Sequence, residues 1–316
     1  MFLSRFSAGR LAALLAVPAL AVAVSACGGH GTKSTPAKAA RSFDLHALAA
    51  RAFGPNAKAR SGRIDGDIAL RLHGAHGFGA PFSLTTNGPF RYRKGAALPD
   101  YRIDMGVRDN GVQLTSAGGR SYVSVGSTGY EVPGGVRARL VRSSSRGANG
   151  LTRTLAQFGI TIRRWETHKH VAGTQRMDGV EVVHVKTGVN VGRVLRDANT
   201  LTGLLSSLGI ARATGLPREL SPAARRVLVR SVATASGSSW IGISDGVLRE
   251  AALTIRFAIA PADRAAVGGM SGGTVTATMK ITDVGRPQRI VAPHPLGSYA
   301  DFQLGLSALG DARSGG

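Results

Sequence analysis

Four segments of the chain alternate apolar and polar residues with a period of two. In residues 62–73, Ile64 and Ile68 share one parity. Asp65 and Asp67 share the other parity. The same alternation recurs in three later segments, residues 101–107, 253–259 and 275–281. Because a period of two places successive side chains on opposite faces of a strand, each segment is predicted to be a β-strand with one face toward a core and the other toward water.

Shorter candidate strands occupy much of the remaining chain. Glycine-containing turns separate several of them, and the sequences DNG at 109–111 and SDG at 244–246 are typical of hairpins. Strands that are polar on one side and joined by short turns form antiparallel sheets. We therefore expect a single antiparallel sheet of eight or more strands. The shorter candidates lie near residues 82–92, 111–117, 120–125, 180–186 and 239–244.

Helical periodicity appears in the middle of the chain. Residues 191–208 carry apolar residues at spacings of three and four, which form one stripe on a helix, and Gly209 is a suitable end. Ser221 and Pro222 are typical of a helix start, so a second helix is predicted from Pro222 through about Ala235. Two shorter helices are expected near residues 150–158 and 45–53.

These elements predict an α+β fold in which a large curved antiparallel β-sheet, a half-barrel, has several helices covering its concave face. Twist and strand glycines allow such a sheet to curl around its cover. The apolar stripe of three or four short helices is narrower than the apolar face of so many strands. One hypothesis is that the remaining concave space is an apolar cavity for a hydrophobic ligand. The alternative is a packed core without a cavity.

The N-terminal segment up to Ala26 has the layout of a secretory signal. Arg5 and Arg10 lie in a short basic head, an apolar run follows from Leu11 to Val24, and small residues precede Cys27. This run is shorter than a helix that spans a bilayer, so a permanent membrane span is the weaker interpretation. The predicted organisation is a signal peptide at 1–26, a flexible tether with a lipidated cysteine at 27–42, one folded domain at 43–300 and a poorly ordered tail at 301–316.

Cys27 is the only cysteine of the sequence, so a disulfide within the chain is excluded. Val24, Ser25, Ala26 and Cys27 resemble the bacterial lipobox, in which an aliphatic residue and two small residues precede a cysteine. The resemblance implies that the leader is removed, that the Cys27 sulfur is joined to a diacylglycerol, and that the protein is anchored to the outer face of the cytoplasmic membrane. The alternative is a spare thiol near a cleavage site.

Basic residues outnumber acidic ones by a wide margin. The chain has 40 lysines and arginines against 18 acids, and two of the arginines lie in the leader, which leaves a net charge of +20. The electrostatic field of such a positive charge favours acidic partners, namely nucleic acid, anionic lipid headgroups or acidic wall polymers. Export and a lipid anchor argue against nucleic acid and favour an anionic membrane surface. Arg91, Arg93 and Arg102 are candidates for holding an anionic headgroup.

Three segments resemble a known group of bacterial lipoproteins. They are GRSYVSVGSTGYEVP at 119–133, WIGISDGVLRE at 240–250 and ITDVGRPQRIVAP at 281–293. Together with the lipobox and the order of elements, they resemble the LppX and LprG type of lipoprotein and, more loosely, the LolA and LolB carriers. The resemblance extends over about residues 62–293. It implies a half-barrel whose cavity holds acylated lipids or glycolipids.

The apolar residues of the predicted helix and strands are the candidate cavity lining. The predicted function is that of an exported lipoprotein, expected as a monomer, that binds a lipid or lipid-linked molecule and carries it across the cell envelope. The alternative is a non-carrier binding or sensor module of the same fold, with a packed core and a basic surface. The central helix supplies Val194, Leu201, Leu204, Leu205 and Leu208 to the lining, and the sheet supplies Leu70, Ile103, Met105, Leu253, Ile255 and Phe257.

No catalytic or metal site is predicted. The sequence GMSGG at 269–273 fits the G-x-S-x-G pattern, but a nucleophile elbow requires a helix after Ser271, and alternating threonines follow instead. His168 and His170 share one side of an extended segment, with His184 on a candidate neighbouring strand. Three imidazoles are able to bind zinc, yet no carboxylate or cysteine has a suitable spacing. We therefore expect no enzyme activity, cofactor or metal.

Overall fold

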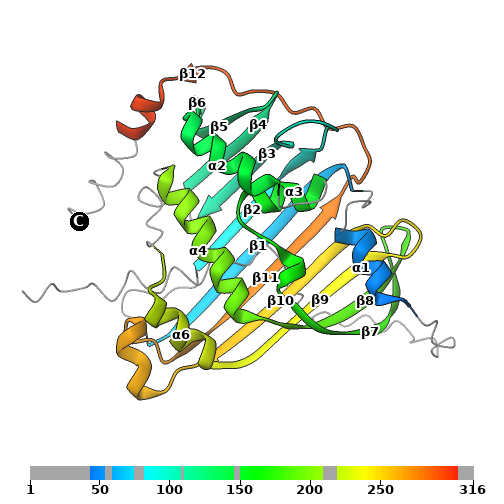
Figure 1. The fold of residues 1–316 in the computed structure, drawn as a ribbon, viewed down its shortest axis with the longest axis vertical. Helices are drawn as coiled ribbons and strands as arrows, with labels where there is room; N and C mark the ends of the chain where they lie inside the picture. Colours follow the sequence, from blue (N-terminus) through cyan, green and yellow to red (C-terminus); the bar gives the residue numbers. More distant parts are fainter. Residues whose placement is uncertain are drawn as a thin grey trace, which may run out of the picture.

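The structure, a computed structural model, describes residues 43–53, 59–74, 82–107, 110–145, 150–208 and 219–304. Within this part, twelve strands form one open sheet in the order β12-β6-β5-β4-β3-β2-β1-β11-β10-β9-β8-β7 (Figure 1). Neighbouring strands are antiparallel, except for the parallel pair β12 and β6. The predicted large antiparallel sheet is confirmed.

The strands shorten toward the β12 edge of the sheet. Their bounds are β1 Ser61–His73, β2 Phe82–Arg91, β3 Asp100–Val107, β4 Asn110–Ala117, β5 Arg120–Val125, β6 Thr128–Glu131, β7 Glu166–Met177, β8 Val180–Val189, β9 Val232–Gly242, β10 Leu248–Ala258, β11 Gly272–Thr282 and β12 Leu296–Gly297.

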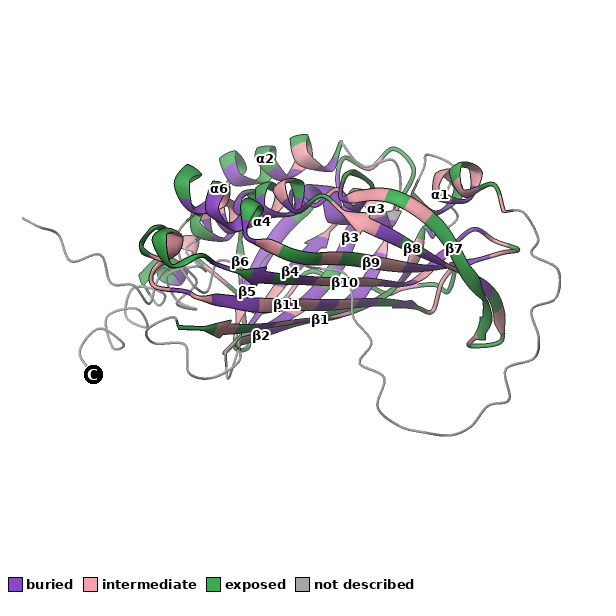
Figure 2. Cartoon of the chain, turned by 90° about the horizontal axis from the view of Figure 1, so that it is seen from below, coloured by how far each residue is buried: buried purple, intermediate pink, exposed green. Residues whose placement is uncertain are grey.

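The helices lie in one layer on a single face of this sheet (Figure 2). Figure 1 shows α4 lying over the central strands, with α6 near one of its ends. The architecture is an α+β half-barrel with a helical cover, as the alternating strands and the helical stripe predict. The helices are α1 Leu45–Phe53, α2 Gly134–Ser144, α3 Gly150–Gln157, α4 Val191–Ser207 and α6 Pro222–Arg230, with the 3-10 helices η3 Ile162–Arg164 and η4 Pro261–Val267.

The core occupies the space between the sheet and this cover. In β1 one parity of residues faces the core as predicted, because Ile64, Ile68 and Leu70 are buried. Asp65 and Asp67, which have the opposite parity, are exposed. One continuous apolar layer joins the sheet to the five α-helices named above, which contribute for example Leu48, Val136, Leu151, Leu201 and Leu228.

A close approach of β2 and β3 accounts for one of the strand glycines. A Cβ atom on Gly88 would lie only 1.8 Å from the Arg102 carbonyl oxygen, and the φ of Gly88 is +151°. Glycine alone fits there without a shift of the backbone. Such positions permit a sheet to bend over its cover.

The structure corrects the predicted end of the second helix. Helix α6 ends at Arg230 instead of Ala235, and Val232 begins strand β9, which pairs with β8. Val232 follows Leu228 at a helical spacing, so the local pattern favours a longer helix. The Ser231 carbonyl, however, accepts a hydrogen bond from the Ala258 N–H of β10 at 2.9 Å. Pairing in the sheet outweighs helical periodicity at this position.

Two other segments add to the elements that the sequence predicts. Helix α2 lies where no element is predicted, and its buried residues Val136, Leu140 and Ser144 have helical spacing. Residues 299–304 are helical, and the rest of the predicted tail lies outside the described residues. The predicted signal peptide, Cys27 and the tether at 27–42 also lie outside them.

Candidate functional site

The predicted lining residues meet in one apolar layer between the sheet and α4. They come from β1, β3, β10 and α4 with its C-terminal cap, and all but Leu204 belong to the single buried hydrophobic cluster. Leu204 is partly buried and packs against this cluster. In this structure these side chains pack into one core, and their role as a cavity lining stays a prediction. The buried members are Val194, Leu201, Leu205, Leu208, Leu70, Ile103, Met105, Leu253, Ile255 and Phe257.

Helix α4 is held over the sheet by its own start and by its apolar stripe. The Asn190 side chain caps the helix by accepting a hydrogen bond from the Arg193 N–H at 3.1 Å. From there Val191, Val194 and Leu195 begin the buried stripe of the helix. Sequence and packing therefore agree on which face of α4 is turned inward.

Asp197 ties α4 to the segment before β7. One of its carboxylate oxygens, Oδ2, accepts hydrogen bonds from the Thr161 N–H and from the Trp165 indole Nε1, both at 2.8 Å. Burial raises the pKa of the Asp197 carboxyl above its ordinary value, against the lowering effect of these two donors. The carboxylate thus joins the helical cover to the chain that leads into the sheet edge.

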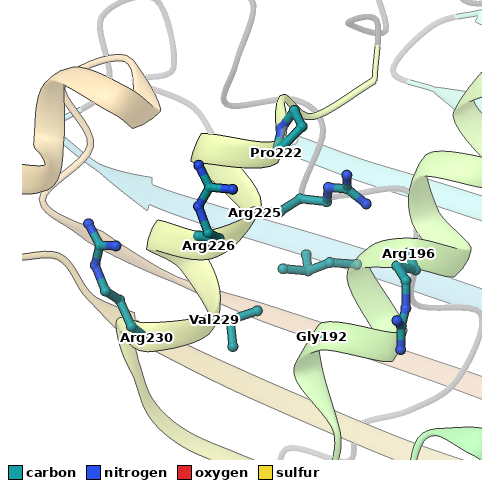
Figure 3. A pocket seen from close by; sticks show the side chains of 8 residues that line it. Gly192, Arg196, Pro222, Arg225, Arg226, Val229 and Arg230 are labelled. Atoms are coloured by element: carbon teal, nitrogen blue, oxygen red, sulfur yellow. The ribbon is translucent and has the colours of Figure 1, made fainter.

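A groove of about 370 Å³ separates α4 from α6 (Figure 3). A volume of this size falls within the range of small-molecule sites. Its apolar wall consists of Gly192, Leu195, Pro222 and Val229. Leu195 is only 1% exposed and also belongs to the hydrophobic cluster. One residue of the apolar layer, Leu195, therefore also borders the groove.

Four arginines line the same groove, namely Arg196, Arg225, Arg226 and Arg230. The Arg230 guanidinium pairs with Asp263, and this hydrogen bond lowers the pKa of the Asp263 carboxyl. Among the described residues, the other three arginines have no acidic partner within salt-bridge distance. The groove is thus apolar at its wall and positively charged at its rim.

Two of the arginines proposed from the sequence as headgroup ligands contact a buried acid instead. Arg91 Nη2 lies 2.8 Å and Arg93 Nε lies 2.9 Å from the Asp100 carboxylate, which is buried to 1% exposure. The Gly118 N–H donates to the same carboxylate at 3.3 Å. Arg102 is exposed on β3. The arginines of the groove lie on α4 and α6, which no local sequence pattern brings together.

A second, smaller cavity lies beside Trp165. Its volume is about 30 Å³, the scale of one water molecule. Ile162, Trp165, Val189 and Leu253 contribute to its wall. Leu253, one of the predicted lining residues, thus borders a small space whose wall also contains polar residues such as Thr187 and Ser239.

The histidines and the serine considered from the sequence lie apart from this groove. His184 stacks on Trp240 with ring centroids 4.5 Å apart, whereas His168 and His170 are exposed on β7. The described residues contain no group of three His, Cys, Asp or Glu side chains that could hold a metal ion. Ser271 stands between η4 and β11, so a strand follows it where a nucleophile elbow needs a helix.

Across the described helices, none combines the length and apolar composition that crossing a bilayer requires.

Comparison with known proteins finds similar structures. No family model matches the chain, and no curated protein matches it. Lipoprotein LppX of Mycobacterium tuberculosis is similar with 13% identity and a TM-score of 0.37, over 79% of this chain and 100% of that one. LprF from Mycobacterium bovis has 11% identity and a TM-score of 0.35, over 76% of this chain and 92% of that one.

Proposed function

We propose that this protein is an exported lipoprotein that binds a lipid or lipid-linked molecule between its sheet and its helical cover. In this proposal, Cys27 carries the diacylglycerol anchor and holds the domain at the outer face of the cytoplasmic membrane. The basic head, the apolar run and the lipobox-like residues before Cys27 support the export and the anchor. The protein acts by binding, without catalysis, and carries the lipid through the envelope as a monomer.

One observation carries the binding proposal: the groove between α4 and α6 reaches Leu195, a member of the core cluster. An acyl chain that enters the groove therefore contacts Val229 and Leu195, and Leu195 packs in the core cluster. Val194, Leu201 and Leu205 follow on the buried face of α4. Insertion of the chain requires α4 to move away from the strands.

The energetics of such an insertion are favourable in outline. Each methylene removed from water contributes roughly 0.8 kcal/mol, so an acyl chain of about 14 methylenes contributes on the order of 10 kcal/mol. The hydrogen bonds between the strands remain intact, because the buried face of α4 contacts the strands through side chains. The ligand replaces the contacts that α4 loses with the strands.

Native mass spectrometry of the full chain tests this function. The protein is purified from membranes without detergent exchange, and adducts with the mass of a lipid are expected on the folded protein. A sample stripped of lipid by unfolding and then refolded is the matched control, and incubation with lipid vesicles should restore its adducts. Failure of both preparations to carry lipid would contradict the proposal.

A second candidate function is a binding module with a packed interior and a basic surface. The observation in its favour is that the predicted lining residues already fill the apolar layer in this structure. For such a module, native mass spectra show the mass of the protein alone, and binding to an acidic polymer weakens steeply with salt. The same two samples therefore separate the two functions.

A further inference from the structure

Arg225 has fewer hydrogen-bond partners than its burial demands. It lies on α6, half-buried, and its Nε is shut off from solvent without a hydrogen-bond partner in the described part of the chain. Figure 3 shows its side chain extending from α6 toward the gap that separates α6 from α4. A buried N–H group that donates to nothing costs free energy, so such a group is rare unless a ligand satisfies it.

Other positive charges lie near Arg225, and in the described part of the chain neither Arg196 nor Arg226 has an acid within salt-bridge distance. Arg226 is its neighbour on α6, and Arg196 lines the same groove from α4. The residues that line the groove include no acid, and Asp263, the acid that reaches its rim, is engaged by Arg230. Like charges gathered on two adjacent helices repel one another. An anion bound between them would relieve this repulsion and supply acceptors for Arg225.

The apolar wall of the groove specifies what kind of anion fits. A free inorganic anion would gain nothing from Leu195, Val229 or Pro222, whereas an amphiphile places its chain on them and its charge at the rim. Phosphate oxygens suit arginine particularly, because the guanidinium fork donates two parallel hydrogen bonds. The combination indicates a lipid whose headgroup contains a negatively charged phosphate.

We propose that the groove between α4 and α6 binds the headgroup of an anionic phospholipid, with Arg225 and Arg196 on opposite sides of its phosphate. The acyl chains pass Leu195 into the apolar layer. This assignment rests on the proposed lipid-binding function and adds to it the class of lipid and the two residues that select it.

Competition between two lipids tests the assignment. The refolded, lipid-free full chain is incubated with vesicles that contain equal amounts of phosphatidylglycerol and phosphatidylcholine with the same acyl chains, and bound lipid is counted by native mass spectrometry. We expect phosphatidylglycerol to be preferred about tenfold, which corresponds to about 1.4 kcal/mol. The double variant Arg196→Gln, Arg225→Gln should bind the two lipids about equally while still binding lipid.

A matched control removes the same charge elsewhere. Arg71 and Arg256 are exposed, and both lie opposite Thr274 in the sheet, so the variant Arg71→Gln, Arg256→Gln lowers the net charge equally without touching the groove. It should keep the preference. Excess inorganic phosphate separates the two sources of the anion, because it should displace little phosphatidylglycerol if the apolar wall contributes as proposed. Complete displacement by phosphate would overturn the assignment to a lipid headgroup.

The possible results distinguish failure of the groove assignment from failure of the proposed lipid-binding function. Equal binding of the two lipids by the unmodified protein overturns the groove assignment and leaves the lipid-binding function intact. Equal loss of preference in both double variants also overturns it, because net charge then suffices. Absence of any bound lipid in the unmodified protein removes the proposed function itself, and the groove assignment with it.

Discussion

Asn199 of α4 and Leu220, which lies just before α6, hold each other through a reciprocal pair of hydrogen bonds. The Asn199 side-chain Nδ2 donates to the Leu220 carbonyl at 3.1 Å, and the Leu220 N–H donates to Asn199 Oδ1 at 3.0 Å. Asn199 is buried to 8% exposure. A single amide thus links α4 to the start of α6, and these two helices border the groove.

Loss of this link should destabilise the protein and loosen the groove. Asn199→Ala leaves a buried N–H and a buried carbonyl without partners, and we expect the free energy of unfolding to fall by about 2–4 kcal/mol. Lipid exchange with vesicles should become faster, because α4 and α6 separate more readily. Urea unfolding and exchange of labelled lipid measure the two effects.

The exposed neighbour Thr200 provides the control for this variant. Its hydroxyl donates to the Arg196 carbonyl of its own helix, at 3.2 Å. Thr200→Ala should change the free energy of unfolding by less than about 0.5 kcal/mol. Equal effects of the two substitutions would show that the Asn199 link is not what holds the helices together.

A disulfide across the groove should block the entry of lipid. A Cβ atom on Gly192 would lie 3.7 Å from Val229 Cγ2, which is close enough for a bond between cysteines at the two positions. In a Cys27→Ala background, Gly192→Cys with Val229→Cys should take up lipid at least about tenfold more slowly when oxidised than when reduced. The reduced protein is its own control. Equal rates in the two states would place the entrance elsewhere.

The buried carboxyl of Asp197 predicts a dependence of stability on pH. Burial raises its pKa, so the folded protein favours the protonated form. The resulting contribution to stability is complete below about pH 3.8, the ordinary Asp value, and is lost as the pH rises through the higher folded-state pKa. Asparagine keeps an oxygen acceptor and does not ionise.

The unfolding free energy of the wild-type protein, minus that of Asp197→Asn, should therefore decrease as the pH rises from below 3.8 toward neutrality. Urea unfolding at a series of pH values measures this difference. A difference that is constant or increases with pH would show that burial does not control this carboxyl.

The arginines around Asp100 should affect stability and leave lipid preference unchanged. Asp100→Asn removes the charge that Arg91 and Arg93 contact, and because both arginines are partly exposed we expect a loss of about 2 kcal/mol in unfolding free energy. The ratio of bound phosphatidylglycerol to phosphatidylcholine should stay as in the wild type. A changed ratio would assign Asp100 and its arginines to the lipid site.

The sheet is the part of the fold that the sequence predicts best, for a physical reason. Strands such as β1 have one face in the core and one face in water, so apolar and polar residues alternate along their sequence. Strand β7 is exposed along most of its length, so its sequence carries no such alternation. The start of β9 near Val232 fits a helix locally, and only its pairing in the sheet decides its conformation.

The candidate site also has one part that the sequence predicts and one part that it does not. The burial of the proposed lining residues is predictable because each belongs to a stripe on its own element, as Leu201 and Leu205 do on α4. The groove is not predictable, because Leu195 and Arg225 lie far apart in the sequence, on two helices whose contact depends on tertiary packing. A local signal for it was the pair of adjacent arginines, Arg225 and Arg226, beside an apolar helix face.

The location of a bound acyl chain tests the central claim most directly. Phosphatidylglycerol with a photoreactive group near the end of one acyl chain is bound to the full-length protein, irradiated and mapped by peptide mass spectrometry. We predict labels on residues of the apolar layer, in Leu201–Leu208 and in Leu253–Phe257 of β10, that unlabelled lipid competes away. Labels confined to exposed residues, such as those of β7, would contradict a ligand between the sheet and its cover.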